Sequence, residues 1–480
     1  MNDIIGRDNE KEQLHQLLQE DTPQLAAIYG RRRVGKTYLI RNYFEQQITF
    51  EMSGIHNATT QEQLDNFSRC LRRSFKTKSA APANWFEAFE KLKTCLKPSA
   101  SKRKRVLFFD EFPWMDTARS GFIKAFEDFW NSWCSRQKNL VIIICGSAAA
   151  WMIKKIVNNK GGLHNRVTKR IRLQPFTLQE IEAYLKFRKV NIDRYQILQL
   201  YMAMGGIPQY LNEIRRGESA VQAIDRICFS KDGLLTEEFP SLYTSLFDEA
   251  QQHTAIINAL AKKPAGLSRN EIITACNLSS GGTVTKLLDE LSESGFITIY
   301  APFGKNVKDS LYKLTDEYSL FYLKFIRNNK NSGKGTWARL FTSSSWKSWS
   351  GLAFESVCLR HIGQIKKALG IGGIHTETSS WRKTPHDNTD KGAQIDLIID
   401  RNDKSINICE IKFSSAPYEI TKAYSEGFNN KLNAFLQASK TRKAIFHTLI
   451  TTYTPVNLNK YTGLIQNIIT MDALFKSSDH

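Results

Sequence analysis

The sequence predicts an α/β protein of several domains, and three observations lead to that fold class. The chain has 480 residues, whereas single domains usually contain about 100–200. Short apolar runs at 25–29, 105–109 and 140–145 have the length and composition of buried strands, and helix-like segments follow the first and the last of them. Residues 394–413 alternate at the strand period on both sides of a polar turn, which predicts a β-hairpin.

Composition places the chain among ordinary globular proteins. Hydrophobic residues make up 41% and charged residues 24%, and the apolar runs are far shorter than the ~20 residues of a membrane-spanning helix. The N-terminus lacks the basic and apolar regions of a signal peptide, and the eight cysteines form no CxxC pair or metal-ligand spacing. We therefore expect a cytoplasmic protein with reduced thiols and no membrane association.

The net charge of the chain is strongly basic. Lys and Arg number 67 against 47 Asp and Glu, which gives +20. An excess of this kind favours polyanionic partners, because lysine and arginine neutralise phosphates and release counterions. Nucleic acid, with DNA in the first place, is the candidate partner. A protein that is simply basic has the same composition, so the motifs have to decide.

A glycine-rich segment follows the first apolar run. Residues 30–37 read Gly-Arg-Arg-Arg-Val-Gly-Lys-Thr, which matches GxxxxGK[ST] between a strand and a helix over 38–44. Glycines let backbone N–H groups wrap phosphates, the lysine reaches the β- and γ-oxygens, and the threonine hydroxyl completes a magnesium shell. The three arginines either meet phosphate or form a solvated loop tip. The pattern predicts ATP and Mg²⁺ as cofactors, with Thr37 on the metal and the nucleotide bound by Gly30, Arg31, Arg32, Arg33, Val34, Gly35, Lys36, Thr37 and Tyr38.

Acidic and polar residues follow the other two apolar runs. Asp110 and Glu111 end the second run, where a P-loop ATPase needs one carboxylate for magnesium and one to polarise water. We therefore assign Asp110 to the metal and Glu111 to catalysis. Ser147 follows the third run and is expected to sense the γ-phosphate beside the attacking water. The alternative is that Ser147 only caps the helix that begins at residue 148.

In this order the motifs resemble the archaeal-type ATPases, which are AAA+-related members of the STAND group. The resemblance implies that Gly206 and Pro208 lie near the adenine in a helical lid. It also implies that Arg166 is a catalytic arginine finger, acting in cis or on a neighbouring subunit of a homo-oligomer. Asn165 stands where related sequences usually carry glycine. The matching segments are Ile-Gly-Arg at 5–7, the P-loop, Phe-Asp-Glu-Phe-Pro-Trp at 109–114, Gly-Ser-Ala at 146–148, residues 165–176 and Gly-Gly-Ile-Pro at 205–208.

A middle segment has the element order of a winged helix. Residues 251–262, 269–276 and 283–294 show helical spacing, and 296–300 with 311–314 form a two-stranded wing. The third helix would enter a major groove if the module reads DNA. Its one basic residue is Lys286, and three acidic residues lie beside it, Asp289, Glu290 and Glu293. A DNA reader and a purely structural module therefore remain alternatives.

The hairpin near the C-terminus brings three ionisable residues to one face. A turn centred on Asp403 places Asp396 opposite Glu410, with Cβ atoms about 5 Å apart, and Lys412 on the same side. Two carboxylates this close repel one another unless a divalent cation lies between them, and a lysine beside them can orient a metal-bound water. The pattern indicates metal-dependent phosphodiester hydrolysis, and the alternative is the polar outer face of an ordinary hairpin.

Together with Glu355, these residues resemble the PD-(D/E)xK nuclease superfamily, to which the C-terminal domain of many archaeal-type ATPases is similar. The resemblance implies a restriction-endonuclease-like α/β domain in which Asp396 and Glu410 bind Mg²⁺ or Mn²⁺. It implies that Glu355 supports the metal from the first helix and that Lys412 serves the attacking water as a catalytic residue. Many such domains have lost activity. The domain is therefore expected either to cleave DNA or to keep the nuclease-like geometry without cleaving.

The predicted architecture is an AAA+-type P-loop ATPase core over 1–175, a helical lid over 176–245, a winged helix over 246–330 and a nuclease-like domain over 331–480. The expected function is ATP-driven action on DNA with a metal-dependent C-terminal nuclease. The alternative is a STAND-type switch, in which ATP turnover controls assembly and the C-terminal domain binds without cleaving.

Overall fold

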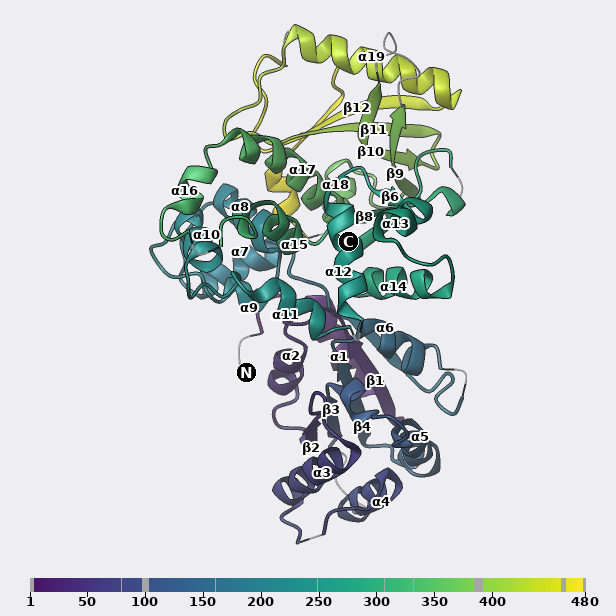
Figure 1. Cartoon of the computed structure of the whole chain (residues 1–480). Coiled ribbons are helices and arrows are strands. Elements are labelled where there is room, and N and C mark those ends of the chain that lie inside the picture. The colour runs from purple at the N-terminus through teal and green to yellow at the C-terminus, as the bar shows by residue number, and fades with distance from the viewer. Residues whose placement is uncertain are drawn as a thin grey trace. The chain divides into compact units, whose positions relative to one another are not determined.

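The computed structural model describes residues 4–78, 80–96, 103–159, 161–247, 249–305, 307–330, 332–383, 392–458 and 463–477. The chain forms two compact units. The first unit holds residues 1–175 with the short segments 246–248 and 289–294, and the second holds the rest. Figure 1 shows the elements of both units, coloured along the chain. The boundary at 175/176 falls where the sequence places the end of the ATPase core.

The first unit is built on a five-stranded parallel sheet in the order β2-β3-β4-β1-β5. Because parallel strands end at the same edge of a sheet, the segments that follow β1, β3 and β4 meet at one edge. The three strands predicted from apolar runs are confirmed. The bounds are β1 (Gln24–Tyr29), β2 (Ile48–Ser53), β3 (Arg105–Asp110), β4 (Leu140–Gly146) and β5 (Lys169–Arg172).

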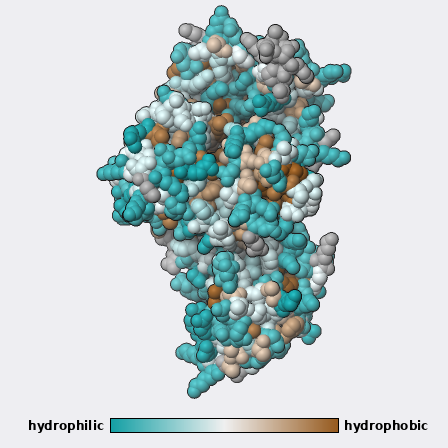
Figure 2. Space-filling view, in the orientation of Figure 1, coloured by the Kyte–Doolittle hydropathy of each residue, from teal (hydrophilic) through white to brown (hydrophobic). Residues whose placement is uncertain are grey.

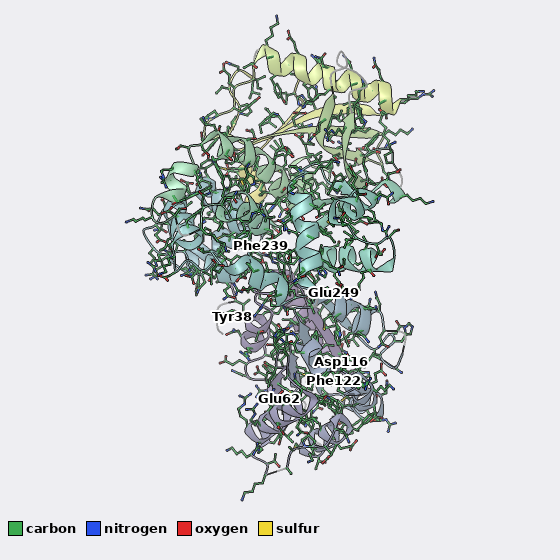
Figure 3. All side chains as sticks on the ribbon, viewed as in Figure 1. Tyr38, Glu62, Asp116, Phe122, Phe239 and Glu249 are labelled. Atoms are coloured by element: carbon green, nitrogen blue, oxygen red, sulfur yellow. The ribbon has the colours of Figure 1, made fainter. Side chains whose placement is uncertain are left out.

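Helices and an aromatic cluster complete the core of the first unit. The rings of Phe89 and Phe129 stack at 4.7 Å between centroids, and Trp85, Phe112 and Phe122 pack around them with no side chain above 1% exposure. Figure 3 labels Phe122 within this unit. Burial of these large rings stabilises the core of the first unit. The helices are α1 (Asp8–Gln19), α2 (Lys36–Tyr43), α3 (Thr60–Phe75), α4 (Trp85–Cys95), α5 (Phe122–Ser132) and α6 (Ala149–Met152).

The second unit begins with a purely helical segment where the lid is predicted. Asp193, Thr177 and Ser219 cap three of its helices through side-chain oxygens that accept from backbone N–H groups. Such caps fix where each helix starts. The helices are α7 (Leu178–Phe187), α8 (Arg194–Met204), α9 (Pro208–Leu211), α10 (Ala220–Phe229) and α11 (Glu238–Thr244).

Gly206 packs directly against the backbone of Phe176 in this helical segment. The N–H of Phe176 donates to the carbonyl oxygen of Gly206 at 2.7 Å, and a Cβ on Gly206 would lie 1.9 Å from the oxygen of Phe176. We expect Gly206→Ala to lower the free energy of unfolding by roughly 2 kcal/mol, because the contact is with backbone that cannot move aside cheaply. Gly281→Ala, with nothing within 4 Å of the added Cβ, is the matched control. Equal chemical denaturation midpoints for the two variants would contradict this role.

The middle module has the helices and the wing that the sequence predicts, with ends that differ by one residue. β7 and β8 pair antiparallel, with Ile297 opposite Leu314. A third, two-residue strand, β6, pairs with β8 on its other side and is too short to leave a periodic signal in the sequence. The elements are α12 (Ala250–Ala261), β6 (Leu267–Ser268), α13 (Arg269–Cys276), α14 (Gly282–Glu293), β7 (Ile297–Tyr300) and β8 (Leu311–Leu314).

The C-terminal part holds a mixed five-stranded sheet in the order β13-β12-β11-β10-β9. β9, β10 and β11 are antiparallel, whereas β11, β12 and β13 are parallel. Phe428 and Phe435 of α19 pack on Ile406, Ile408 and Ile398, so this helix covers one face of the sheet. The bounds are β9 (Thr376–Lys383), β10 (Ala393–Arg401), β11 (Ser405–Lys412), α19 (Lys422–Ser439), β12 (Ala444–Thr451) and β13 (Asn467–Thr470).

The helices before this sheet include α15 (Glu317–Phe321), α16 (Thr336–Leu340), α17 (Ser344–Arg360) and α18 (Ile362–Ala368). Within the described part of the chain, no helix is long and apolar enough to cross a membrane. Hydrophilic side chains dominate the face drawn in Figure 2, and hydrophobic ones gather there in small patches.

Candidate nucleotide site and carboxylate cluster

The P-loop lies between the end of β1 and the start of α2. Gly30 has φ +149, and a Cβ there would lie 2.3 Å from the oxygen of Leu173, while Gly35 has φ +94. Both positions therefore require glycine. At Gly30 the reason is the close approach of the Leu173 backbone, and at Gly35 it is the left-handed backbone conformation. The Lys36 ammonium is buried and donates to the carbonyl oxygens of Gly30 at 2.9 Å and Arg31 at 3.0 Å. Burial lowers the pKa of Lys36, and the nearby carboxylate of Glu111 acts in the opposite direction.

Thr37 and Asp110 lie together at the same sheet edge. The Thr37 hydroxyl donates to Oδ2 of Asp110 at 2.8 Å. Oδ1 of Asp110 is buried and has no hydrogen-bond partner among the described residues, and burial raises the pKa of this carboxyl. A buried carboxylate oxygen without a donor, beside a hydroxyl oxygen, fits a hard divalent cation, because Mg²⁺ prefers oxygen ligands. These two residues could hold the magnesium of a bound nucleotide.

Glu111 and Ser147 contact each other directly. Oε2 of Glu111 accepts from the Ser147 hydroxyl at 2.7 Å and from the Ser147 N–H at 3.1 Å. Glu111 itself has φ 44, a left-handed backbone that turns its side chain out of the strand direction. The helix-capping alternative for Ser147 is wrong, because α6 begins at Ala149 and its N-cap, Ala148, makes no side-chain cap. The hydroxyl instead holds the carboxylate at the carboxyl ends of β3 and β4.

We expect Glu111→Gln to retain ATP binding and to lose hydrolysis by at least about a hundredfold, because an amide cannot accept the proton of the attacking water. Ser147→Ala should cost less, roughly tenfold, since it removes one hydrogen bond to the carboxylate and leaves the base in place. Phosphate release and nucleotide binding would be measured for both variants. The control is Asp65→Asn, the same chemical change on an exposed carboxylate of α3. Loss of binding in Glu111→Gln would instead make Glu111 a structural residue.

The P-loop arginines and Tyr38 differ in exposure. Arg31 is buried, whereas Arg32 and Arg33 are half-buried, so the solvated-tip alternative is wrong for Arg31. Arg33 has φ 70, which places it in the left-handed region. Tyr38, on α2, is 56% exposed and lies at the surface of the first unit (Figure 3). The structure alone assigns no ligand to these four side chains.

Arg166 lies near the amino-terminal ends of the parallel strands, whereas the P-loop follows the carboxyl end of β1. Arg166 is therefore badly placed to act on a nucleotide bound by its own chain. Thr168, just before β5, bonds to Leu25 at the start of β1, whereas Arg172 is level with Tyr29 at the P-loop end. With about 3.3 Å per residue, the exposed Arg166 starts well over 10 Å from the P-loop. The cis form of the prediction is therefore corrected. Asn165 has φ 53, a conformation that asparagine tolerates better than most residues, which explains how it replaces glycine there.

Arg7 contributes to this site in a way that sequence reasoning did not anticipate. Its buried guanidinium donates from Nη2 to the carbonyl oxygen of Val34 at 3.1 Å and from Nη1 to that of Gln174 at 2.7 Å. The side chain thus ties the P-loop to the segment that follows β5. In the sequence, Arg7 is marked only by the Ile-Gly-Arg motif at 5–7. This motif supports the family resemblance but does not predict either hydrogen bond of Arg7.

Gly206 and Pro208 belong to the second unit, and Pro208 is the first residue of α9. The close approach of Gly206 to Phe176 gives this glycine a structural role of its own. Its predicted place near the adenine stays a prediction.

The hairpin of β10 and β11 has the register predicted from the sequence. Leu397 lies opposite Cys409 and Asp400 opposite Ile406, which centres the turn on Asp403. The same register continued by one pair puts Asp396 opposite Glu410. Ile406, Ile408 and Glu410 alternate along β11, so the carboxylate projects toward the face covered by α19.

Electrostatics show that the predicted carboxylates influence one another. Burial, and then the charge of Asp396, raises the pKa of Glu355 to about 7. Burial, and then the charge of Glu410, raises the pKa of Asp396. Burial alone would lower the pKa of Lys412, but Glu410 and Asp396 outweigh it and raise this pKa, so the ammonium keeps its charge. The four residues form one site, which we call the carboxylate cluster.

The predicted ligand set of three carboxylates stays a prediction. Among the described residues, no three His, Cys, Asp or Glu side chains are arranged to hold a metal ion. Glu410 forms ion pairs with two ammonium groups, Lys412 at 3.4 Å and Lys431 at 2.7 Å. The pKa values of Asp396 and Glu355 are raised, so a cation beside them would stabilise their charged forms.

Lys431 is the residue of this cluster that the sequence did not predict. It lies on α19, and its ammonium donates to Oε1 of Glu410. A lysine on an amphipathic helix usually faces solvent, and only the packing of α19 on β11 turns this one inward. No local motif carries that information.

The family match agrees with the nucleotide site. Residues 5–214 match the family described as an ATPase domain predominantly from Archaea. An uncharacterized protein of Methanocaldococcus jannaschii is 23% identical over 414 residues, which cover 85% of this chain and 87% of the relative. A Walker-type ATPase of Pyrococcus abyssi aligns with a TM-score of 0.47 and 16% identity, over 67% of this chain and 96% of that one.

The ORC2 protein of Aeropyrum pernix, solved as ADPNP and ADP complexes, aligns with a TM-score of 0.40 and 14% identity. The alignment covers 71% of this chain and 97% of that one. The family match, the GxxxxGK[ST] loop and the acidic end of β3 lie in one segment. Residues 5–214 therefore resemble ATPase domains of the P-loop type.

Proposed function

We propose that the chain uses ATP hydrolysis to direct metal-dependent cleavage of DNA by its second unit. The observation that carries this proposal is the carboxylate cluster, in which the charges of Asp396 and Glu410 help to raise the pKa of Glu355 and Asp396, respectively, beside Lys412. Buried like charges are costly, so a fold that keeps them together has a use for a positive ligand there.

The roles in the cluster follow from its chemistry. Asp396 and Glu410 would hold Mg²⁺ or Mn²⁺, and Glu355 would supply further negative charge from α17. Such a cation would supply Lewis-acid stabilisation of the phosphodiester. Lys412, charged and next to Glu410, would orient the attacking water, and Lys431 would hold Glu410 in place from α19.

In the nucleotide site, Lys36 would neutralise the β- and γ-phosphates, and Thr37 with Asp110 would hold Mg²⁺. Glu111 would accept the proton of the attacking water while Ser147 positions its carboxylate. Arg166 would act on the nucleotide of a second copy, since its own P-loop lies at the other edge of the sheet. This role requires a homo-oligomer.

The net charge of +20 supports DNA as the polyanion. We expect DNA affinity to fall steeply with salt, the slope of log K against log[salt] growing by roughly 0.9 for each phosphate neutralised. Fluorescence anisotropy of a labelled duplex between 50 and 200 mM salt would measure it. A flat salt dependence, or no binding at about 50 mM salt, would remove DNA from the proposal.

A second candidate function is an ATP-controlled assembly switch whose C-terminal domain binds without cleaving. The ion pairs of Glu410 with both Lys412 and Lys431 favour it, because they balance the carboxylate without any metal. The position of Arg166 also suits a protein that completes its ATPase site on assembly.

A nuclease assay on the purified full chain separates the two candidates. Plasmid, linear duplex and single-stranded DNA would be incubated with Mg²⁺ or Mn²⁺, each with and without ATP. Cleavage that requires the metal and disappears in Glu410→Ala supports the nuclease. Nucleotide-dependent oligomers without cleavage of any substrate support the switch.

A further inference from the structure

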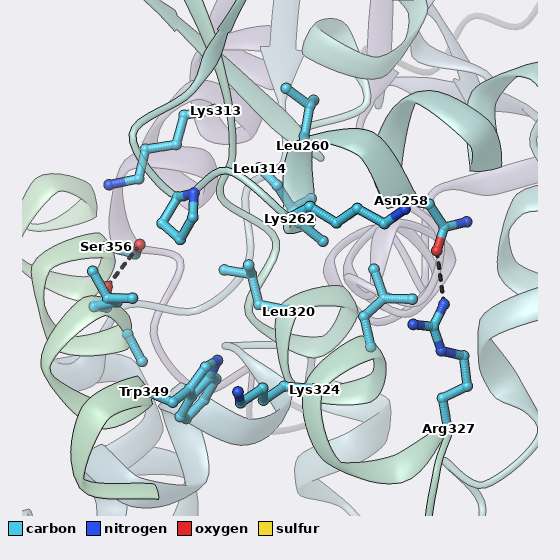
Figure 4. Close-up of a pocket in the computed structure, with 15 residues that line it drawn as sticks. Asn258, Leu260, Lys262, Lys313, Leu314, Leu320, Lys324, Arg327, Trp349 and Ser356 are labelled. Carbon is cyan, nitrogen blue, oxygen red and sulfur yellow. Dashed lines mark hydrogen bonds between the residues drawn. The ribbon is translucent and has the colours of Figure 1, made fainter. Parts of the chain in front are cut away.

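A small cavity lies in the second unit where the middle module meets α17. Its volume is about 190 Å³. Three stretches of chain line it: the end of α12 with the turn after it, the end of β8 with the helical segment 320–327, and the middle of α17. Figure 4 shows these side chains converging from separate elements on one hollow.

The cavity has an apolar interior and a cationic rim. Leu314, Leu323 and Trp349 are buried in its wall, and the half-buried Leu320 and Leu352 also line it. Four cations surround this surface, and none of the described residues that line it is acidic. Arg327 donates to Oδ1 of Asn258 at 2.9 Å, which fixes one cation at the rim. The cations are Lys262, Lys313, Lys324 and Arg327.

The cavity lies next to the carboxylate cluster. Lys313 lines the cavity and also interacts electrostatically with Glu355. Ser356, the neighbour of Glu355 on α17, lines the cavity as well. The cavity and the cluster therefore share Lys313 and are lined by adjacent residues of α17.

We propose that this cavity receives one base of single-stranded DNA, with the flanking phosphates on Lys262, Lys324 and Arg327. A ligand that is planar and apolar at its centre and negative on both sides matches an apolar pocket ringed by cations. The volume is below the roughly 300–1,000 Å³ of sites for drug-sized ligands, so it suits one ring system rather than a whole nucleotide. The inference rests on the proposed function, because it assigns a substrate contact to the same nucleic-acid site.

The test compares two oligonucleotides of equal charge. A 12-nucleotide oligothymidylate and an abasic sugar–phosphate chain of the same length carry the same phosphates, and only the first has bases. We expect the full chain to bind the thymidylate at least about fivefold more tightly in fluorescence anisotropy at low salt, since base stacking and burial add to phosphate contacts.

Two variants locate the effect. Leu352→Trp adds a large ring to the lining of the cavity and should remove the preference for bases while leaving the abasic chain unaffected. The double variant Lys262→Glu with Lys324→Glu should weaken both ligands at least about tenfold, because it reverses two phosphate contacts. Lys347→Glu, on α17 and exposed but outside the cavity, is the charge control. Unchanged thermal melting and ATP turnover would show that each variant is folded.

Equal affinity of the wild-type chain for the two oligonucleotides overturns the proposal, and so does a base preference that survives in Leu352→Trp. Binding of an acidic peptide such as polyglutamate in place of either oligonucleotide would assign the cavity to a protein partner and overturn it as well. Metal-dependent cleavage is measured on the same thymidylate. Cleavage without base preference would support the proposed function and reject base binding in the cavity. Base preference without cleavage would support base binding in the cavity and reject the nuclease.

Discussion

Lys36→Ala should reduce ATP turnover at least about a hundredfold. The ammonium is buried inside the P-loop and bonded to the carbonyl oxygens of Gly30 and Arg31. A bound triphosphate would present its β- and γ-oxygens to this group, whose charge offsets the negative charge that develops as the phosphoryl group is transferred. Steady-state phosphate release and nucleotide binding would be measured on the same preparation.

The matched control for this variant is Lys124→Ala, which removes an exposed lysine from α5 of the same unit. Its turnover should equal that of the wild type. Retention of more than about a tenth of wild-type turnover by Lys36→Ala would contradict the role of the P-loop in hydrolysis. Because Lys36 is buried, a melting curve is needed to show that the loss is not one of folding.

The sequence predicts those parts of the nucleotide site whose residues lie at the end of a strand or directly after it. The P-loop follows β1 directly, and Asp110 ends β3, so a parallel sheet brings them together without further information. Arg7 could not be placed in this way. Its two carbonyl partners are 27 and 167 residues away, and only the packed fold sets those distances.

The hairpin register was predictable for the same reason, since a short turn centred on Asp403 fixes the pairing of both strands. Lys431 was not, because it reaches Glu410 from a helix 21 residues further on. The start of α17 at Ser344 depends on tertiary packing as well, because Trp346 and Trp349 are buried against Phe325 and anchor its first turns.

The cavity beside α17 escaped sequence reasoning altogether. Its lining comes from stretches up to about a hundred residues apart, and no single stretch carries a motif. From the sequence, a lysine on a short strand, such as Lys313, is expected to be an ordinary exposed cation. Only tertiary packing shows that it faces both the cavity and Glu355.

The second large effect is expected at the carboxylate cluster, where Asp396→Ala or Glu410→Ala should abolish metal-dependent DNA cleavage and leave ATP turnover unchanged. Either change removes an oxygen ligand for the cation, whereas the P-loop lies in the other unit. Lys412→Ala should also stop cleavage but spare metal binding, because an ammonium donates hydrogen bonds and is not a ligand. Calorimetric titration with Mn²⁺ would separate these two classes of variant.

Asp400→Ala is the control for these variants, because Asp400 lies on the same strand as Asp396 but forms an ion pair with Lys443. It should cleave like the wild type. Since Lys412 and Lys431 form ion pairs with Glu410, Lys431→Ala should bind Mn²⁺ more tightly if the ammonium competes with the cation, and more weakly if it positions the carboxylate. Cleavage that persists in Glu410→Ala would mean that this cluster is not the nuclease site, and the ion pairs of Glu410 would then be structural.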